Sequence, residues 1–209
     1  MAGQFAAFLG VAIVVIVTPG PDTALTIRNT LLGGRRSGIF TAFGIVTGQA
    51  TWALATSAGI AALLRASEPA FVAVKLVGAA YLVFLGGQAL LGSLRPRRGK
   101  AERLIEGASP RLSRALAFRQ GILSNLGNPK MAAFFPSLLP QFAPRGSFGA
   151  LLLLGVVFCF LTLVWLTAYA VAVAKAGDFL RRSGVRRALE AVTGAVLVAL
   201  GLRLASEHR

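Results

Sequence analysis

Thr18-Pro19-Gly20-Pro21-Asp22 interrupts an apolar stretch that begins at Phe5 and continues to Leu32. A second apolar stretch, residues 116–142, is interrupted in the same way by Asn125-Leu126-Gly127-Asn128-Pro129-Lys130. Proline, glycine and charge are costly inside a segment of membrane length, because non-helical backbone is tolerated in lipid only where it is buried in protein or lines a cavity. Two such broken segments at corresponding places in two halves predict a binding site within the membrane.

Six apolar stretches reach the roughly 20 residues that an α-helix needs to cross a bilayer. They cover residues 5–32, 39–64, 70–94, 116–142, 148–174 and 188–205. Only 14% of the residues are charged, whereas about a quarter are charged in a soluble domain. The sequence therefore predicts an all-α polytopic membrane protein with six transmembrane helices, of which the first and fourth are broken, in one transmembrane domain over residues 1–209.

The basic residues are concentrated in alternate connections between the apolar stretches. Of the 22 Lys and Arg residues, 16 lie in or beside the first, third and fifth connections: Arg28, Arg35, Arg36, Arg95, Arg97, Arg98, Lys100, Arg103, Arg111, Arg114, Arg119, Lys175, Arg181, Arg182, Arg186 and Arg187. Basic loops of this kind face the cytoplasm, which places both termini outside and makes anionic membrane lipids the partners of these loops. The net charge of +15 does not indicate nucleic acid, because the basic residues are not set on a soluble face with aromatic residues.

The two halves of the chain are predicted to be inverted repeats. Each half has three spans, an odd number, so two halves in tandem cross the membrane in opposite senses. We place repeat one at residues 1–94, a basic cytoplasmic loop at 95–115 and repeat two at 116–209. Residues 77–86 align with residues 192–201 at six of ten identical positions. A shared bias toward Ala, Val, Leu and Gly would also produce matches, but the corresponding broken first spans favour duplication.

The prolines at the breaks predict new helices that begin inside the membrane. Proline lacks an N–H and cannot continue a helix that arrives from its N-terminal side, but it fits the first turn of a new helix. We therefore interpret Thr18 as an N-cap with Pro19 as the first helical residue, and Asn128 with Pro129 in the same way. The N–H groups at such helix ends attract anions, including carboxylates.

Asp22 and Lys130 are the charged residues beside the breaks, and a charged side chain at this depth is rare and functional by default. In one interpretation, Asp22 binds the ammonium of a zwitterion while Lys130 or a helix end binds its carboxylate. In a second, Asp22 carries a coupling proton. In a third, the role is static, and Asp22 satisfies first-turn N–H groups or pairs with Lys130. The predicted substrate- or ion-binding residues are Pro19, Gly20, Pro21, Asp22, Asn125, Asn128, Pro129 and Lys130.

Gln49 and Tyr81 are secondary candidates, and each has two interpretations, helix packing or substrate contact. Gln49 lies beside Gly44 and Gly48, whose Gly-x-x-x-Gly spacing lets two helices approach closely. The single cysteine, Cys159, cannot cycle between dithiol and disulfide by itself, which argues against a membrane redox carrier. No Ser/His/Asp, Cys/His or metal-ligand cluster is present, so the sequence predicts no enzyme, no cofactor and no metal.

Several motifs resemble those of the LysE/RhtB amino-acid exporters, over nearly the whole chain. They are Thr18-Pro19-Gly20-Pro21-Asp22, Arg28-Asn29-Thr30, Gly33-Gly34-Arg35-Arg36-Ser37-Gly38, Gly44-Ile45-Val46-Thr47-Gly48, Gly78-Ala79-Ala80-Tyr81-Leu82, and Asn125-Leu126-Gly127-Asn128-Pro129-Lys130 with the later Phe134-Phe135 and Leu139-Pro140-Gln141-Phe142. The resemblance places the family's functional motifs on Pro19 to Asp22 and on Asn128 to Lys130.

The resemblance implies a secondary transporter of the bacterial inner (plasma) membrane that exports amino acids or close derivatives. It implies coupling to the proton gradient or the membrane potential, and it leans toward the homoserine/threonine-exporter branch. A channel-like or redox-carrier membrane protein of the same architecture is the alternative. The solute, the coupling ion and the oligomeric state, a homo-oligomer included, stay open.

Overall fold

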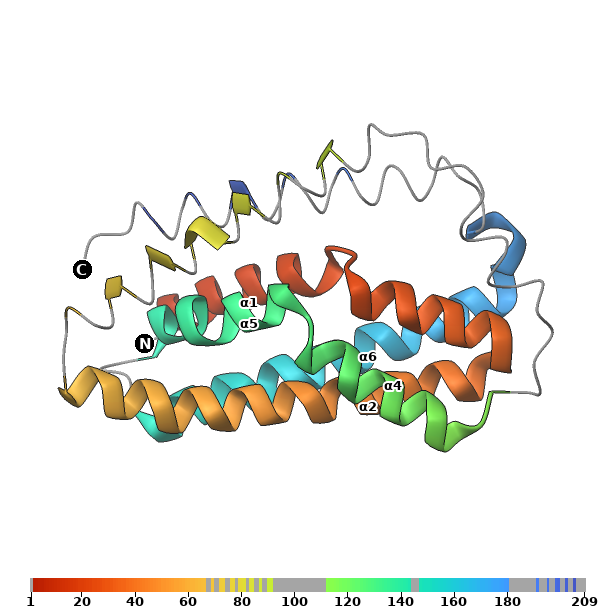
Figure 1. Cartoon of the computed structure of the whole chain (residues 1–209), viewed down its shortest axis with the longest axis horizontal. Helices are drawn as coiled ribbons and strands as arrows, with labels where there is room; N and C mark the ends of the chain where they lie inside the picture. Colours follow the sequence, from red (N-terminus) through yellow and green to blue (C-terminus); the bar gives the residue numbers. More distant parts are fainter. Residues whose placement is uncertain are drawn as a thin grey trace.

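The computed structural model describes residues 2–66, 112–143 and 147–180 continuously, together with scattered positions of 69–91 and 191–205. The elements in chain order are α1 (Ala2–Val17), α2 (Pro21–Ala66), α4 (Arg114–Leu126), α5 (Pro129–Ala133), the π-helical η1 (Phe134–Leu138), the 3₁₀-helical η2 (Leu139–Phe142) and α6 (Phe148–Leu180). The described residues form helices and no strand (Figure 1). The all-α prediction is therefore confirmed for this part of the chain.

Helix α2 consists of two arms that run antiparallel, because the chain reverses at Gly34. Gly34 has φ 76° and ψ −179°, a left-handed conformation that favours glycine. The Asn29 side-chain amide donates to the Thr41 hydroxyl at 3.0 Å, whereas twelve residues of straight helix would separate them by about 18 Å. Figure 1 shows the ribbon turning back at this point. The arms, residues 21–33 and 35–66, correspond to the second half of the first predicted span and to the second predicted span.

Both predicted interruptions occur where the sequence indicates. α1 ends at Val17 and α2 begins at Pro21, while α4 ends at Leu126 and α5 begins at Pro129. The first arm of α2 lies antiparallel to α4, since Asn29 hydrogen-bonds to Gln120 while Asp22 hydrogen-bonds to Asn125. The two broken segments therefore run in opposite directions and meet at their breaks (Figure 1).

The cap predicted at the first break is wrong. The Thr18 N–H and hydroxyl both donate to the Val14 carbonyl, so Thr18 completes α1 and caps no helix. The Gly20 carbonyl accepts the Ala24 N–H, which makes Gly20 the residue before the helix and Pro21, not Pro19, the first helical residue. At the second break the prediction is confirmed, because the Asn128 side chain accepts the Lys130 N–H at 3.0 Å and Pro129 begins α5.

The second half of the fourth predicted span is not a regular α-helix. After one turn of α5 the backbone widens into the π-helical η1 and then tightens into η2. Pro136 and Pro140 lie within these two elements, and each removes the N–H that an α-helical ladder would need. The proline spacing thus accounts for the change in helix type.

Three glycines allow α2 and α4 to pack closely, and two of them are in direct contact with backbone. A Cβ at Gly44 would lie 2.0 Å from the Phe118 carbonyl oxygen, and one at Gly121 would lie 2.4 Å from the Thr41 carbonyl oxygen. A Cβ at Gly48 would lie 2.9 Å from the side chain of Asn125. The predicted close approach at Gly-x-x-x-Gly is confirmed, and it presses the second arm of α2 against the residues just before the second break.

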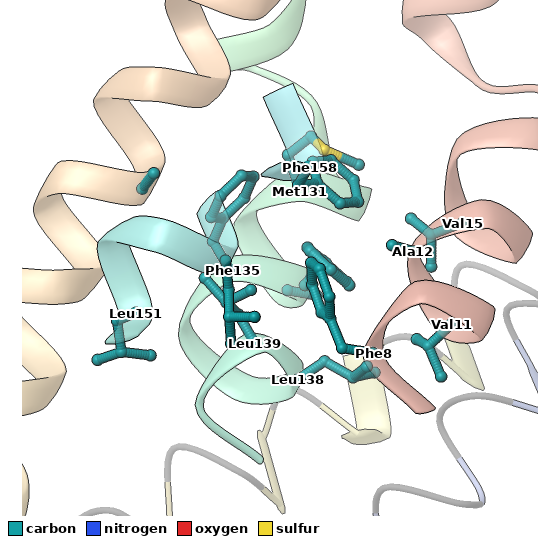
Figure 2. Packing of buried hydrophobic residues seen from close by; sticks show 14 of the residues in the cluster. Phe8, Val11, Ala12, Val15, Met131, Phe135, Leu138, Leu139, Leu151 and Phe158 are labelled. Carbon is teal, nitrogen blue, oxygen red and sulfur yellow. The ribbon is translucent and has the colours of Figure 1, made fainter. Parts of the chain in front are cut away.

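The apolar core joins α1, the η1–η2 region and α6, as Figure 2 shows for Phe8, Phe135 and Phe158. The opposite face of α6 is unlike that of a soluble helix. Its large apolar side chains Leu153, Val156, Phe160 and Val164 are 53% to 64% exposed. An apolar outer face of this kind, around an interior that buries many polar groups, is typical of a protein surrounded by lipid.

Two described helical stretches, Pro21–Gly59 and Phe148–Lys175, are long and apolar enough to cross a membrane, and Gly3–Val17 forms a shorter apolar helix. The reversal at Gly34 divides the first of these stretches, so it does not act as one straight rod. The third and sixth predicted spans, the aligned segments 77–86 and 192–201 and most of the basic residues of 95–115 lie largely outside the described residues.

Candidate functional site

The Asp22 carboxylate is the centre of the polar site at the breaks. It is the second residue of α2, and its side chain is 8% exposed. One carboxylate oxygen accepts from the Ser124 hydroxyl at 2.7 Å. The other accepts from the amides of Asn125 at 2.7 Å and Asn128 at 2.9 Å. All three donors lie in or just before the second break, so this single carboxylate connects the two broken segments.

The Lys130 ammonium makes the reciprocal connection. It is 8% exposed and lies in the first turn of α5. It donates to the carbonyl oxygens of Val15 and Thr18, both at 3.0 Å. These carbonyls end α1, where the helix dipole carries partial negative charge that a cation stabilises. Gly20 lies against the ammonium, since a Cβ there would be 3.4 Å from Nζ.

The two buried charges therefore connect the broken segments in both directions. Asp22, at the positive end of α2, accepts from side chains of the second segment, and Lys130 donates to the carbonyls at the negative end of α1. The described residues show no direct ion pair between these two groups, so the predicted static pairing is not how the two charges are satisfied. The N-terminus of α5 is not freely exposed either, because the Asn128 side chain accepts the N–H of Lys130.

The structure brings most of the predicted site residues together. Gly20, Asp22, Asn125, Asn128 and Lys130 make the contacts given above. Pro19, Pro21 and Pro129 shape the backbone, and Pro21 itself is exposed.

The two secondary candidates differ in position. Gln49 is 2% exposed, and its amide nitrogen lies 3.8 Å from the Met131 sulfur, one residue from Lys130. Tyr81 is 39% exposed and stacks on Phe84 at 6.3 Å, so it is not among the buried groups at the breaks.

Ser124 is the residue that sequence reasoning missed. It directly precedes Asn125, and the local signal that could have found it is a second short polar side chain at the end of an apolar run. The sequence also did not predict a second buried hydrogen-bond network. In this network, the Asn29 side-chain amide donates to Thr41 and to Gln120, both at 3.0 Å. Asn29 is fully buried and lies two helical turns beyond Asp22. The polar interior therefore extends from the breaks along the first arm of α2.

One family model and several bacterial proteins match this chain. The family model described as LysE type translocator matches residues 13–208. The uncharacterized membrane protein YrhP of Bacillus subtilis is 28% identical over 94% of this chain and 96% of its own length. An uncharacterized membrane protein of Vibrio cholerae is 30% identical over 96% of this chain and 95% of its own length.

The leucine efflux protein of Klebsiella pneumoniae is 32% identical over 66% of this chain, which spans 63% of that protein's length. No solved structure matches the chain. The family model covers nearly the whole chain, both breaks included. The chain therefore belongs to the LysE type translocator family and is a bacterial membrane protein.

Proposed function

We propose that this chain is a secondary transporter that exports amino acids or close derivatives across the bacterial inner membrane. Membership of the translocator family and similarity to leucine efflux proteins support amino-acid export. The observation that carries the proposal is the pair of buried, opposite charges at two helix breaks that meet. Buried ionisable groups of this kind in a membrane protein mark substrate or ion pathways.

The contacts suggest how a zwitterion enters the site. In this state, protein groups satisfy both charges: amides and a hydroxyl surround Asp22, and the carbonyls of α1 hold Lys130. The ammonium of an amino acid replaces some donors on Asp22, and its carboxylate draws Lys130 away from Val15 and Thr18. Release of the α1 carbonyls frees the end of that helix to move, so substrate binding is coupled to a change between two packed states.

We propose that export is driven by the proton gradient or the membrane potential, with Asp22 as the group that exchanges a proton or a substrate ammonium. The channel-like alternative would show flux that does not saturate with substrate. For a redox carrier, the chain offers a single buried cysteine, Cys159, whose sulfur lies 3.9 Å from the Val46 carbonyl oxygen. Dithiol exchange needs a second thiol, so this alternative has no chemical support among the residues of the chain.

Reconstituted protein provides the direct test. Proteoliposomes are loaded with a panel of amino acids, including leucine, threonine, homoserine and lysine, and efflux is followed under an imposed pH gradient. We expect saturable efflux of at least one neutral amino acid that depends on the gradient. Liposomes without protein, and collapse of the gradient by an ionophore, are the controls. Efflux of no panel member above the protein-free rate would contradict the proposal.

We also propose six spans in two inverted repeats, with the 95–115 loop in the cytoplasm. Cysteines are introduced as Ser109→Cys, in this loop, and as Ser147→Cys, in the short connection before α6, on a Cys159→Ala background that has no other cysteine. In intact cells, a membrane-impermeant maleimide is expected to label position 147 and not position 109. Permeabilised cells, in which both react, are the control. Labelling of position 109 from outside would overturn the orientation.

A further inference from the structure

Four buried side-chain polar atoms in the described part of the chain have no hydrogen-bond partner. They are Gln49 Oε1, Asn125 Oδ1, Thr162 Oγ1 and Trp165 Nε1. Buried polar atoms without partners are few in native proteins, and each requires an explanation. The first two lie at the breaks already described. The other two lie on α6, which the proposed site has not used so far.

The Thr162 hydroxyl differs from those of several other buried threonines. The Thr162 side chain is 4% exposed. Thr26, Thr30 and Thr41 of α2 are also buried, and each hydroxyl donates to the carbonyl four residues earlier. This back-bond is the usual way in which a helical threonine satisfies its hydroxyl. The Thr162 hydroxyl does not make it, so the hydroxyl is left available to a group outside its own helix.

Both α6 residues lie at the level of the second break. The Phe158 ring stacks on Phe134 at 4.6 Å, and α6 begins soon after η2 ends. Thr162 lies one helical turn beyond Phe158, and Met131 lies about one turn before Phe134. Antiparallel packing therefore brings Thr162 level with Met131 and its neighbour Lys130.

Trp165 comes one turn later on the same face of α6, level with the start of α5. It packs against both apolar clusters of the interior, and its ring lies 5.5 Å from that of Tyr169. Gln49 reaches the same level from α2, because its amide contacts the Met131 sulfur. Gln49 of α2, Asn125 of α4 and the two residues of α6 therefore carry their unpartnered polar atoms at about the level of Lys130.

The four unpartnered atoms differ in whether they accept or donate a hydrogen bond, and the difference follows the helix to which they belong. Asn125 donates its amide nitrogen to Asp22, which fixes its free oxygen as an acceptor, and Gln49 presents an oxygen as well. On α6 the Trp165 indole N–H can only donate, and the Thr162 hydroxyl can donate. The two acceptors therefore lie on α2 and α4, and the two donors lie on α6. This polarity complements a molecule with an ammonium at one end and a carboxylate at the other.

We propose that Thr162 and Trp165 form a carboxylate subsite on α6, which orients the exported amino acid, while Gln49 and Asn125 accept from its ammonium beside Asp22. Lys130 provides the positive charge, and the α6 groups provide neutral hydrogen bonds of fixed direction. The inference rests on the proposed function and goes beyond it, because it assigns substrate-binding residues on a helix outside both broken segments.

The test compares an amino acid with the amine that lacks its carboxylate group altogether. The variants are Thr162→Val, Trp165→Phe and the two combined. The panel amino acid with the fastest efflux is the substrate, and the corresponding amine is the competitor. Loss of hydrogen bonds to a charged group weakens binding by about tenfold or more. We expect the double variant to raise the apparent KM for the amino acid by at least about tenfold while the amine competes as well as before.

Two measurements distinguish a lost carboxylate subsite from a damaged fold. Thr162→Val removes an unpartnered group, so its thermal midpoint in detergent is expected to equal or exceed that of the wild type. Thr47→Val, which removes an exposed hydroxyl bonded to the Phe43 carbonyl, is the matched control and should not change the KM. An unchanged preference for the carboxylate in the double variant would overturn the subsite. Failure of the wild type to transport any amino acid would instead count against the proposed function.

Discussion

Asp22→Asn is expected to abolish efflux and to leave folding and membrane insertion intact. The side chains have the same shape, and Asn can preserve the hydrogen bonds of the closed state. Its oxygen accepts from Asn125 and Asn128, and its nitrogen donates to the Ser124 hydroxyl. What it loses is the negative charge. Because neither a substrate ammonium nor a proton finds a carboxylate at this position, we expect efflux to fall by at least ~100-fold, which corresponds to about 3 kcal/mol.

The measurement is initial efflux from proteoliposomes that contain equal amounts of folded protein, with the thermal midpoint of each variant measured in detergent. Ser124→Ala is the matched control, because it removes one hydrogen bond to the same carboxylate, of 2.7 Å, without a change in charge. We expect that control to retain efflux within about tenfold of the wild type. Undiminished efflux by Asp22→Asn would remove the charge of Asp22 from the mechanism.

The breaks themselves could be predicted because their causes are local. Two prolines and a glycine in three consecutive residues end a helix whatever surrounds them, and Asn128 before Pro129 is a complete capping signal. The choice of cap at the first break is less local. Thr18-Pro19 and Gly20-Pro21 both suit a helix start, and the structure selects the second because Thr18 completes the hydrogen bonds of α1. Local chemistry thus located the break within a few residues but did not identify the capping residue.

The partners of the charges could not be predicted in this way. Ser124 and Asp22 are separated by 102 positions, and their contact depends on the antiparallel packing of α2 against α4. That packing in turn depends on backbone contact at Gly44 and Gly121. Two opposite charges in lipid favour a static pairing of Asp22 with Lys130. It is replaced here by contacts with helix carbonyls and amides, which sequence patterns do not specify.

Lys130→Met is expected to abolish efflux and also to destabilise the protein, which Asp22→Asn does not. The ammonium donates to the carbonyls of Val15 and Thr18, and methionine leaves both without a donor. An orphaned buried acceptor costs about 1–3 kcal/mol, and the Asp22 charge loses its compensating cation. We expect a lower thermal midpoint in detergent, together with efflux at the level of protein-free liposomes. An unchanged thermal midpoint would show that the two carbonyls do not depend on Lys130.

The double variant Asp22→Asn/Lys130→Met separates a structural role of the charges from a role in transport. With both charges removed, no uncompensated charge remains in the interior, so the double variant should be more stable than Lys130→Met alone. Its efflux should nevertheless stay abolished, because neither end of a zwitterion finds its counter-charge. If the charges served only to hold the two breaks together, the neutral pair would recover both stability and efflux. Recovery of efflux by the double variant would therefore contradict the zwitterion site, whereas recovery of stability alone would support it.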